Sequence, residues 1–235
     1  MDNLKISQHI SRRYNEELED IRSRVLAMGG LVEEQLRQAM QALEELNAEL
    51  ARRVVDNDVM VNTMEVSIDE ECAQILAKRQ PAASDLRLVV AVIKTITDLE
   101  RIGDEAERIA CAATELVDYY LGAEKLFTQI YTLGQHVRAM LHGALDAFTH
   151  MDTDKAVEVW REDRFVNREY EALIRELMTY MMEDPQSIPA IVKAIFVARA
   201  IERIGDRASN ICEYVIYLVK GKDVRHTRVD QQLGD

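Results

Sequence analysis

Apolar residues recur at steps of three and four along most of the chain, which is the period of an amphipathic helix. We predict six long helices, at about residues 7–46, 49–79, 84–121, 124–150, 154–183 and 189–219. Only three prolines and nine glycines interrupt the 235 residues, and a Gly29-Gly30 pair within the first helix predicts a kink. Long helices joined by short connections predict an all-α fold with antiparallel neighbours.

The chain contains a duplication. The run Glu-Arg-Ile-Gly-Asp occurs at residues 100–104 and again at 202–206, and all three prolines lie at corresponding helix junctions in the two halves. A repeat of about 100 residues has the size of a domain. We therefore expect two tandem three-helix bundles, at residues 1–121 and 122–221, followed by a polar tail at 222–235. Apolar residues on a second face of the third and sixth helices predict that these two helices form the central pair between the units.

The repeated run places carboxylates on stripes that are apolar earlier in each helix. Helical spacing aligns Glu100, Asp104, Glu107 and Cys111, and the second copy aligns Glu202 with Asp206 and then Ser209 and Glu213. Carboxylates on a core face cost several kcal/mol each unless an arginine, a proton or a metal ion neutralises them. Both an arginine partner, such as Arg101 or Arg203, and a metal ion satisfy this requirement.

If a metal ion neutralises these carboxylates, its protein ligands are oxygen atoms. Its candidates are Glu100, Asp104, Glu107, Glu202, Asp206 and Asn210, with Asp58, Asn62, Asp163 and Asn167 as further ligands from the preceding helices. Such ligands suit Mg²⁺, Mn²⁺ or Ca²⁺, and carboxylate clusters also hold iron and zinc. The two sites cannot be identical, because Ser209 stands where the first half has Glu107.

Net charge, apolar stretches and cysteine spacing exclude several classes of protein. The net charge of −13 repels nucleic-acid phosphates and anionic lipids, so we expect no direct binding to DNA or RNA. The amino terminus has no apolar stretch of signal-peptide length, and no later run reaches transmembrane length, which predicts a cytoplasmic protein. The three cysteines, Cys72, Cys111 and Cys212, form no C-x-x-C motif, and we expect all three in the core.

Several stretches resemble the PhoU family of bacterial phosphate-transport accessory and regulatory proteins. They are KRQPAASDLR at 78–87, TDLERIGD at 97–104, IERIGDRASNICEY at 201–214 and VKGKDVRH at 219–226, and the similarity extends over essentially the whole chain. The resemblance implies a double three-helix bundle without catalytic activity of its own. It also implies multinuclear metal binding through the Glu/Asp-x-x-x-Asp motifs, which are here Glu100 with Asp104 and Glu202 with Asp206.

The resemblance further implies a negative regulator of the phosphate-starvation regulon that modulates phosphate uptake. Its expected partners are the ATPase of the phosphate importer and the sensor histidine kinase, with membrane association only through them, and a second copy in a homodimer. The alternative from another class is a metal-dependent phosphoester hydrolase or a metal-storage bundle. A ferritin-like oxidase is disfavoured, because none of the five histidines follows a glutamate at a spacing of three residues.

Overall fold

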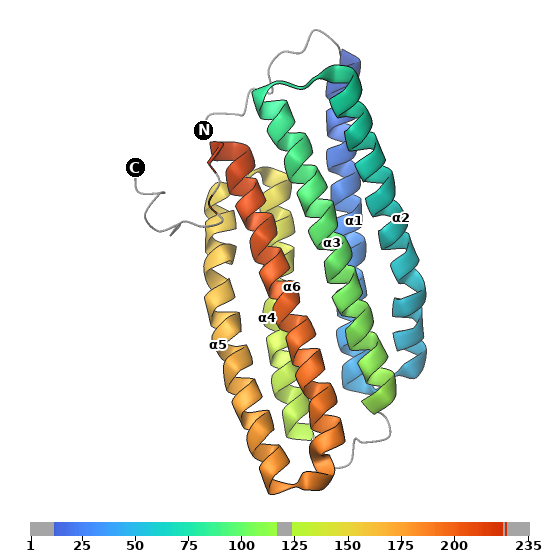
Figure 1. Ribbon diagram of the computed structural model, residues 1–235, viewed down its shortest axis with the longest axis vertical. Helices are drawn as coiled ribbons and strands as arrows, with labels where there is room; N and C mark the ends of the chain where they lie inside the picture. Colours follow the sequence, from blue (N-terminus) through green and yellow to red (C-terminus); the bar gives the residue numbers. More distant parts are fainter. Residues whose placement is uncertain (1–11, 117–123, 223, 225–235) are drawn as a thin grey trace.

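The computed structural model describes residues 12–116, 124–222 and 224, and in these residues the protein is a pair of three-helix units. The first unit contains α1 (Arg12–Glu45), α2 (Ala48–Arg79) and α3 (Ala83–Leu116). The second contains α4 (Glu124–His150), α5 (Thr153–Glu183) and α6 (Ile188–Lys220), with a short 3₁₀ helix, η2 (Pro185–Ser187), before α6. Figure 1 shows the two units side by side, with the second unit displaced along the long axis relative to the first. The predicted all-α tandem architecture is confirmed.

The first connection of each unit has the same local chemistry. Leu46 and Met151 adopt positive φ angles of 49° and 52°. The next residues, Asn47 and Asp152, cap α2 and α5 with side-chain oxygens that accept backbone N–H groups. Such caps satisfy donors that a helix start would otherwise leave unpaired. The same turn therefore sets an antiparallel hairpin in both units.

The central pair is α3 and α6, as the apolar pattern predicts. These helices pack against each other between the units (Figure 1), and α1 contacts α4 behind them. The second-face residues of α3 and α6 that motivated the prediction are fully buried, namely Ile102, Ile109, Leu116, Ile204 and Ile211. Both units thus share one continuous apolar core.

Two glycines allow α1 and α4 to approach closely. A Cβ on Gly29 would lie 2.6 Å from Cδ2 of Leu145, and a Cβ on Gly134 would lie 2.3 Å from Cε of Met40. The offset of 105 residues that relates Asn47 to Asp152 also relates Gly29 to Gly134 and Met40 to Leu145. The duplication therefore creates a reciprocal contact in which each unit inserts one side chain over the other unit's glycine.

Some boundary predictions need correction. The helix α1 continues through Gly29-Gly30 without interruption, since the close approach to Leu145 uses the small size of Gly29 rather than its flexibility. The helix α3 begins at Ala83, one residue before its predicted start. Predicted starts before residue 12 and the unit boundary at 121/122 fall outside the described residues. Of the predicted tail, Lys222 and Val224 are described, and Lys222 is exposed whereas Val224 is buried.

One of the three cysteine predictions was wrong. Cys72 and Cys212 are buried, whereas Cys111 is exposed. Cys111 lies on the same line of α3 as the carboxylates, and that line follows the margin of the core instead of its centre. Among the described residues, no helix combines the length and apolarity that crossing a membrane requires.

Candidate metal centres

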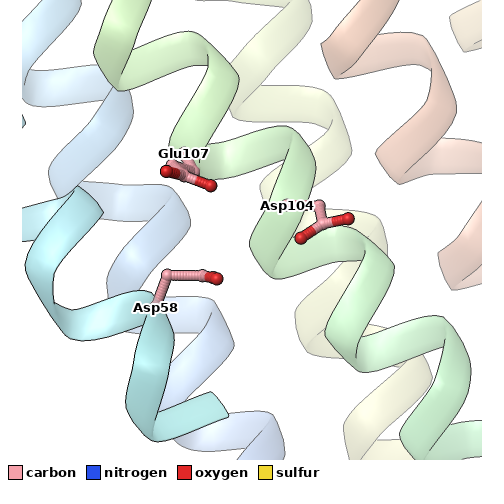
Figure 2. A group of neighbouring side chains, drawn as sticks. All are labelled: Asp58, Asp104 and Glu107. Atoms are coloured by element: carbon pink, nitrogen blue, oxygen red, sulfur yellow. The ribbon is translucent and has the colours of Figure 1, made fainter. Parts of the chain in front are cut away.

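Three carboxylates of the first unit converge on one point (Figure 2). Asp58 comes from the middle of α2, and Asp104 and Glu107 come from successive turns of the antiparallel α3. One oxygen of each lies within 4.8 Å of the others. Asp58 is only 5% exposed, while Asp104 and Glu107 are half-buried. Residues three apart share a helix face, so α3 presents both of its carboxylates to Asp58.

Amide side chains hold Asp58 in place. Gln35 of α1 donates to Oδ1 and Asn62 donates to Oδ2, each at 2.9 Å. Gly103, the glycine of the repeated run, makes room for this pair, because a Cβ there would lie 3.0 Å from Oδ1 of Asp58. Gln35 was not predicted as part of this site, since nothing local to α1 indicates which polar residue will meet α2.

Burial and mutual repulsion raise the pKa values of these acids. The pKa of Asp104 is raised by burial and then by the charge of Asp58, and the same two causes raise that of Glu107. Burial and the charge of Asp104 raise the pKa of Glu100. Arg108 opposes the shift at Asp104 and Glu107, but it donates its hydrogen bond to Glu105, at 2.9 Å. The cluster therefore favours an additional positive charge.

The second unit repeats the arrangement with fewer acids. Asp163 of α5 occupies the position of Asp58 and accepts from Asn167 at 2.9 Å, but its Oδ1 is buried without a hydrogen-bond partner. Burial and the charge of Asp206 raise the pKa of Asp163 to about 6. Glu202 is 8% exposed, and Arg199 donates to its Oε1 at 2.7 Å. Its other oxygen, Oε2, is also buried without a partner.

A pocket of about 580 Å³ opens between α5 and α6 at this point. Asp163, Asp206 and Asn210 line it, and Ser209 stands in the place of Glu107. Glu202 is not part of the lining. The side-chain nitrogen of Asn210 lies 3.5 Å from Asp98 of α3, so this residue also contributes to the junction between the units.

The structure thus brings only some of the predicted ligands together. In the first unit Asp104 and Glu107 join Asp58, and Glu100 lies outside that group of three. In the second unit Asp206 and Asn210 share the pocket with Asp163, and Glu202 lies in the adjoining core. Asp58 and Asp163 take central places, although the spacing argument ranked them as secondary. The sequence signal for their role as ligands was that Asp58 and Asn62 recur as Asp163 and Asn167, 105 residues later.

The donor set of both clusters fits a hard cation. Carboxylate and amide oxygens are the ligands that Mg²⁺, Mn²⁺ and Ca²⁺ prefer. Buried oxygens without hydrogen-bond partners include Asn62 Oδ1 in the first unit, and Asp163 Oδ1 and Glu202 Oε2 in the second. A buried acceptor without a partner costs free energy, and a bound cation would remove that cost. Asp58, Asp104 and Glu107 could hold one cation, and Asp163 with Asp206 could hold another.

Comparison with known proteins agrees with this duplicated geometry. The family model for the PhoU domain matches the chain twice, at residues 25–113 and 130–215. The chain belongs to the PhoU family. Both matches include one copy of the repeated run, so each PhoU domain contributes one α3-type or α6-type helix and its carboxylates.

Alignments with named relatives span nearly the whole chain. The phosphate-specific transport system accessory protein PhoU of Serratia marcescens is 54% identical over 96% of this chain and 92% of its own length. The protein of that name from Escherichia coli strain K12 is 52% identical over 98% of this chain and 95% of its own. The crystal structure of PhoU from Pseudomonas aeruginosa matches with a TM-score of 0.86 and 49% identity, covering 89% of this chain and 100% of that one.

A more distant PhoU structure has the same fold. The phosphate transport system regulatory protein PhoU from Streptococcus pneumoniae is 32% identical and matches with a TM-score of 0.82. It covers 90% of this chain and 99% of that one. The six-helix architecture of the PhoU family is therefore compatible with large changes in side chains.

Proposed function

We propose that this protein is a non-enzymatic regulator of phosphate uptake. In this proposal it represses the phosphate-starvation regulon when phosphate is plentiful, and it acts in the cytoplasm as a homodimer. It links the ATPase of the phosphate importer to the sensor histidine kinase. The names of its relatives, a transport accessory protein and a transport regulatory protein, support the regulatory role.

The observation that carries the metal-binding part is the convergence of Asp58, Asp104 and Glu107. Their oxygens lie within 4.8 Å of one another at the margin of the core, and the pKa values of Asp104 and Glu107 are raised. A divalent cation held there would cross-link α2 and α3, and a second at Asp163 and Asp206 would cross-link α5 and α6. Cation binding would thus fix the relative position of these helices within each unit.

An affinity pull-down from phosphate-replete cells tests the adaptor role. We compare wild type with the Asp104→Asn, Asp206→Asn double variant and identify the proteins recovered. A matched control, Asp69→Asn with Asp154→Asn, removes the same charge from exposed positions on α2 and α5. We expect wild type and control to recover a transporter ATPase or a membrane histidine kinase, and the double variant to lose it while it stays folded and contains less metal.

The alternative proposal is a metal-dependent phosphoester hydrolase or a metal store. The arginines beside Asp163 and Asp206 are the feature that favours a hydrolase, because hydrolysis needs a positive group for the departing phosphate. A wild-type protein that recovers neither partner contradicts the adaptor proposal. Metal analysis and a phosphoester screen of the purified protein then decide between the two alternatives.

A further inference from the structure

The pocket of the second unit carries an unusual concentration of arginine for so acidic a chain. Arg161 and Arg164 line it from α5, and Arg203 and Arg207 line it from α6. Three carboxylates, Asp163, Asp206 and Glu213, share the lining. The lining thus holds four guanidinium groups and three carboxylates, although the whole chain carries a net charge of −13.

The duplication shows that this charge is specific to the second unit. Offsets of 105 residues for α2 and α5, and of 102 residues for α3 and α6, relate the two copies. The residues that correspond to Arg161, Arg164, Arg203 and Arg207 are Asp56, Val59, Arg101 and Glu105. Three of the four basic positions are thus acidic or apolar in the first unit. The scaffold itself does not require arginine at these positions.

Contacts with the first unit orient two of the guanidinium groups. Nη1 of Arg203 donates to Oε1 of Glu105 at 3.2 Å, and Nη1 of Arg207 donates to Oδ1 of Asp98 at 2.9 Å. Each of these hydrogen bonds uses one nitrogen of a group that carries five N–H donors. The remaining donors can serve a ligand in the pocket. Because α3 already restricts both side chains, binding would cost less conformational entropy than it would with freely rotating arginines.

We propose that this pocket binds a phosphoryl oxyanion, either inorganic phosphate or the phosphate group of a monoester, together with a divalent cation. Planar guanidinium groups match the tetrahedral oxygens of phosphate in paired hydrogen bonds. Ser209 and Asn210 add a hydroxyl and an amide to the lining. At about 580 Å³ the pocket has room for phosphate and for a larger monoester.

The cation is required because Asp163 and Asp206 would repel an anion that entered alone. A cation between these carboxylates and the phosphate oxygens would neutralise both and join them. This part rests on the proposed function, which places a cation at Asp163 and Asp206. The arginine contacts stand on the geometry of the pocket itself.

Calorimetric titration of the full-length protein tests the proposal. Mg²⁺ is titrated first, and inorganic phosphate is then titrated with and without Mg²⁺ at 150 mM salt. We expect one phosphate per chain, with affinity raised by at least about tenfold when Mg²⁺ is present. The Arg161→Gln, Arg164→Gln variant should lose at least about tenfold in phosphate affinity and keep its Mg²⁺ binding.

The matched control is Arg168→Gln with Arg175→Gln, which removes the same charge from α5 outside the pocket. Its phosphate affinity should change by less than about twofold, since neither residue lines the pocket and both are exposed to screening by salt. Circular dichroism melting confirms that both variants are folded. Equal losses in the two variants would overturn the proposal, because they would indicate a general effect of surface charge.

Titration with N-acetyl-phosphoserine amide distinguishes the two sources of phosphate. Tighter binding of this monoester identifies a phosphorylated partner, and tighter binding of inorganic phosphate identifies the free anion. Wild-type protein that binds Mg²⁺ but neither phosphate species overturns the oxyanion proposal and leaves the proposed function standing. Binding of phosphate without any binding of Mg²⁺ overturns the cation half of this proposal and leaves only the arginine contacts. It also contradicts the metal-binding part of the proposed function.

Discussion

The two units have the same helices and very different charge. The three helices of the first unit contain 22 acidic and 13 basic residues, whereas those of the second contain 13 and 12. The difference is visible at the carboxylate clusters. Asp58 meets Asp104 and Glu107 in the first unit, and in the second Asp163 faces a pocket that four arginines line.

The features that the units share are those that the backbone requires. Asn47 and Asp152 cap equivalent helices, and Gly29 and Gly134 allow the same close approach of α1 and α4. Side chains at the margins of the core are free of these steric requirements, so they differ without changing the fold. A duplicated scaffold can thus hold two chemically distinct sites.

The largest expected loss of stability comes from substituting a residue that only one unit possesses. Asp98 of α3 is 4% exposed and accepts from Arg207 at 2.9 Å and from Tyr214 at 2.8 Å, whereas its counterpart in α6 is Ala200. We expect Asp98→Ala to lower the free energy of unfolding by about 3 kcal/mol, because it leaves a partly buried guanidinium without its carboxylate. Urea denaturation measures the loss.

The control for this variant is another ion pair between the same two helices. Glu115 of α3 pairs with Lys193 of α6, and the side chain of Glu115 is 51% exposed. Glu115→Ala should change stability by less than about 1 kcal/mol, the usual range for exposed pairs. Similar losses for the two variants would contradict the view that the junction depends on its buried polar contacts.

Substitutions of glycine by leucine in α1 and α4 test the reciprocal glycine contact, and their expected effect on stability is the next largest. Gly29→Leu should lower the free energy of unfolding by about 1–3 kcal/mol through overpacking against Leu145. Gly30→Leu is the matched control, since nothing lies within 4 Å of a Cβ at Gly30, and it should gain about 0.5–1 kcal/mol from helix propensity. Gly134→Leu should cost less than Gly29→Leu, because the neighbouring end of Met40 is flexible. Equal stability of the two α1 variants, measured by urea denaturation, would disprove the packing argument.

The smallest expected changes in stability come from substituting the two central aspartates, Asp58 and Asp163, in metal-free protein. The pKa of Asp163 rises from 3.8 to about 6 on folding, so its ionisation destabilises the folded state progressively as the pH rises through this window. At pH 7 the carboxylate is charged and partly desolvated, and Asp163→Asn should therefore stabilise the protein by about 1–2 kcal/mol. At pH 4 the gain should vanish, because the folded-state carboxyl is already protonated.

The same substitution should have the opposite sign in the first unit. Both oxygens of Asp58 accept hydrogen bonds, from Gln35 and Asn62, so Asp58→Asn puts its NH2 group against one of these two amide donors. The lost hydrogen bond outweighs the relief of repulsion with Asp104 and Glu107. We expect a loss of about 1 kcal/mol at pH 7 in the presence of a chelator. A gain at Asp58, or a loss at Asp163, in thermal melts across this pH range would show that the two clusters differ less than their contacts indicate.

Much of the candidate site could be predicted because the motif residues repeat at fixed offsets. Asp104 and Asp206, and the matching Asp58 and Asp163, were found from spacing alone. Other members could not be found this way. Gln35 reaches Asp58 from a helix distant in sequence, Asp98 meets Arg207 across the junction, and Cys111 is exposed although it follows the pattern of the core line.

The sequence by itself determined the helices and the duplication. Periodicity acts over a few residues of chain, and a repeated run is visible without any structure. The caps Asn47 and Asp152 were recognised only in the structure. Only the tertiary structure decided which polar groups meet. Contacts such as Gln35 with Asp58 and Arg203 with Glu105 depend on the rotation and register of packed helices. Those are set by the sum of many weak packing contacts, and no single stretch of sequence carries that information.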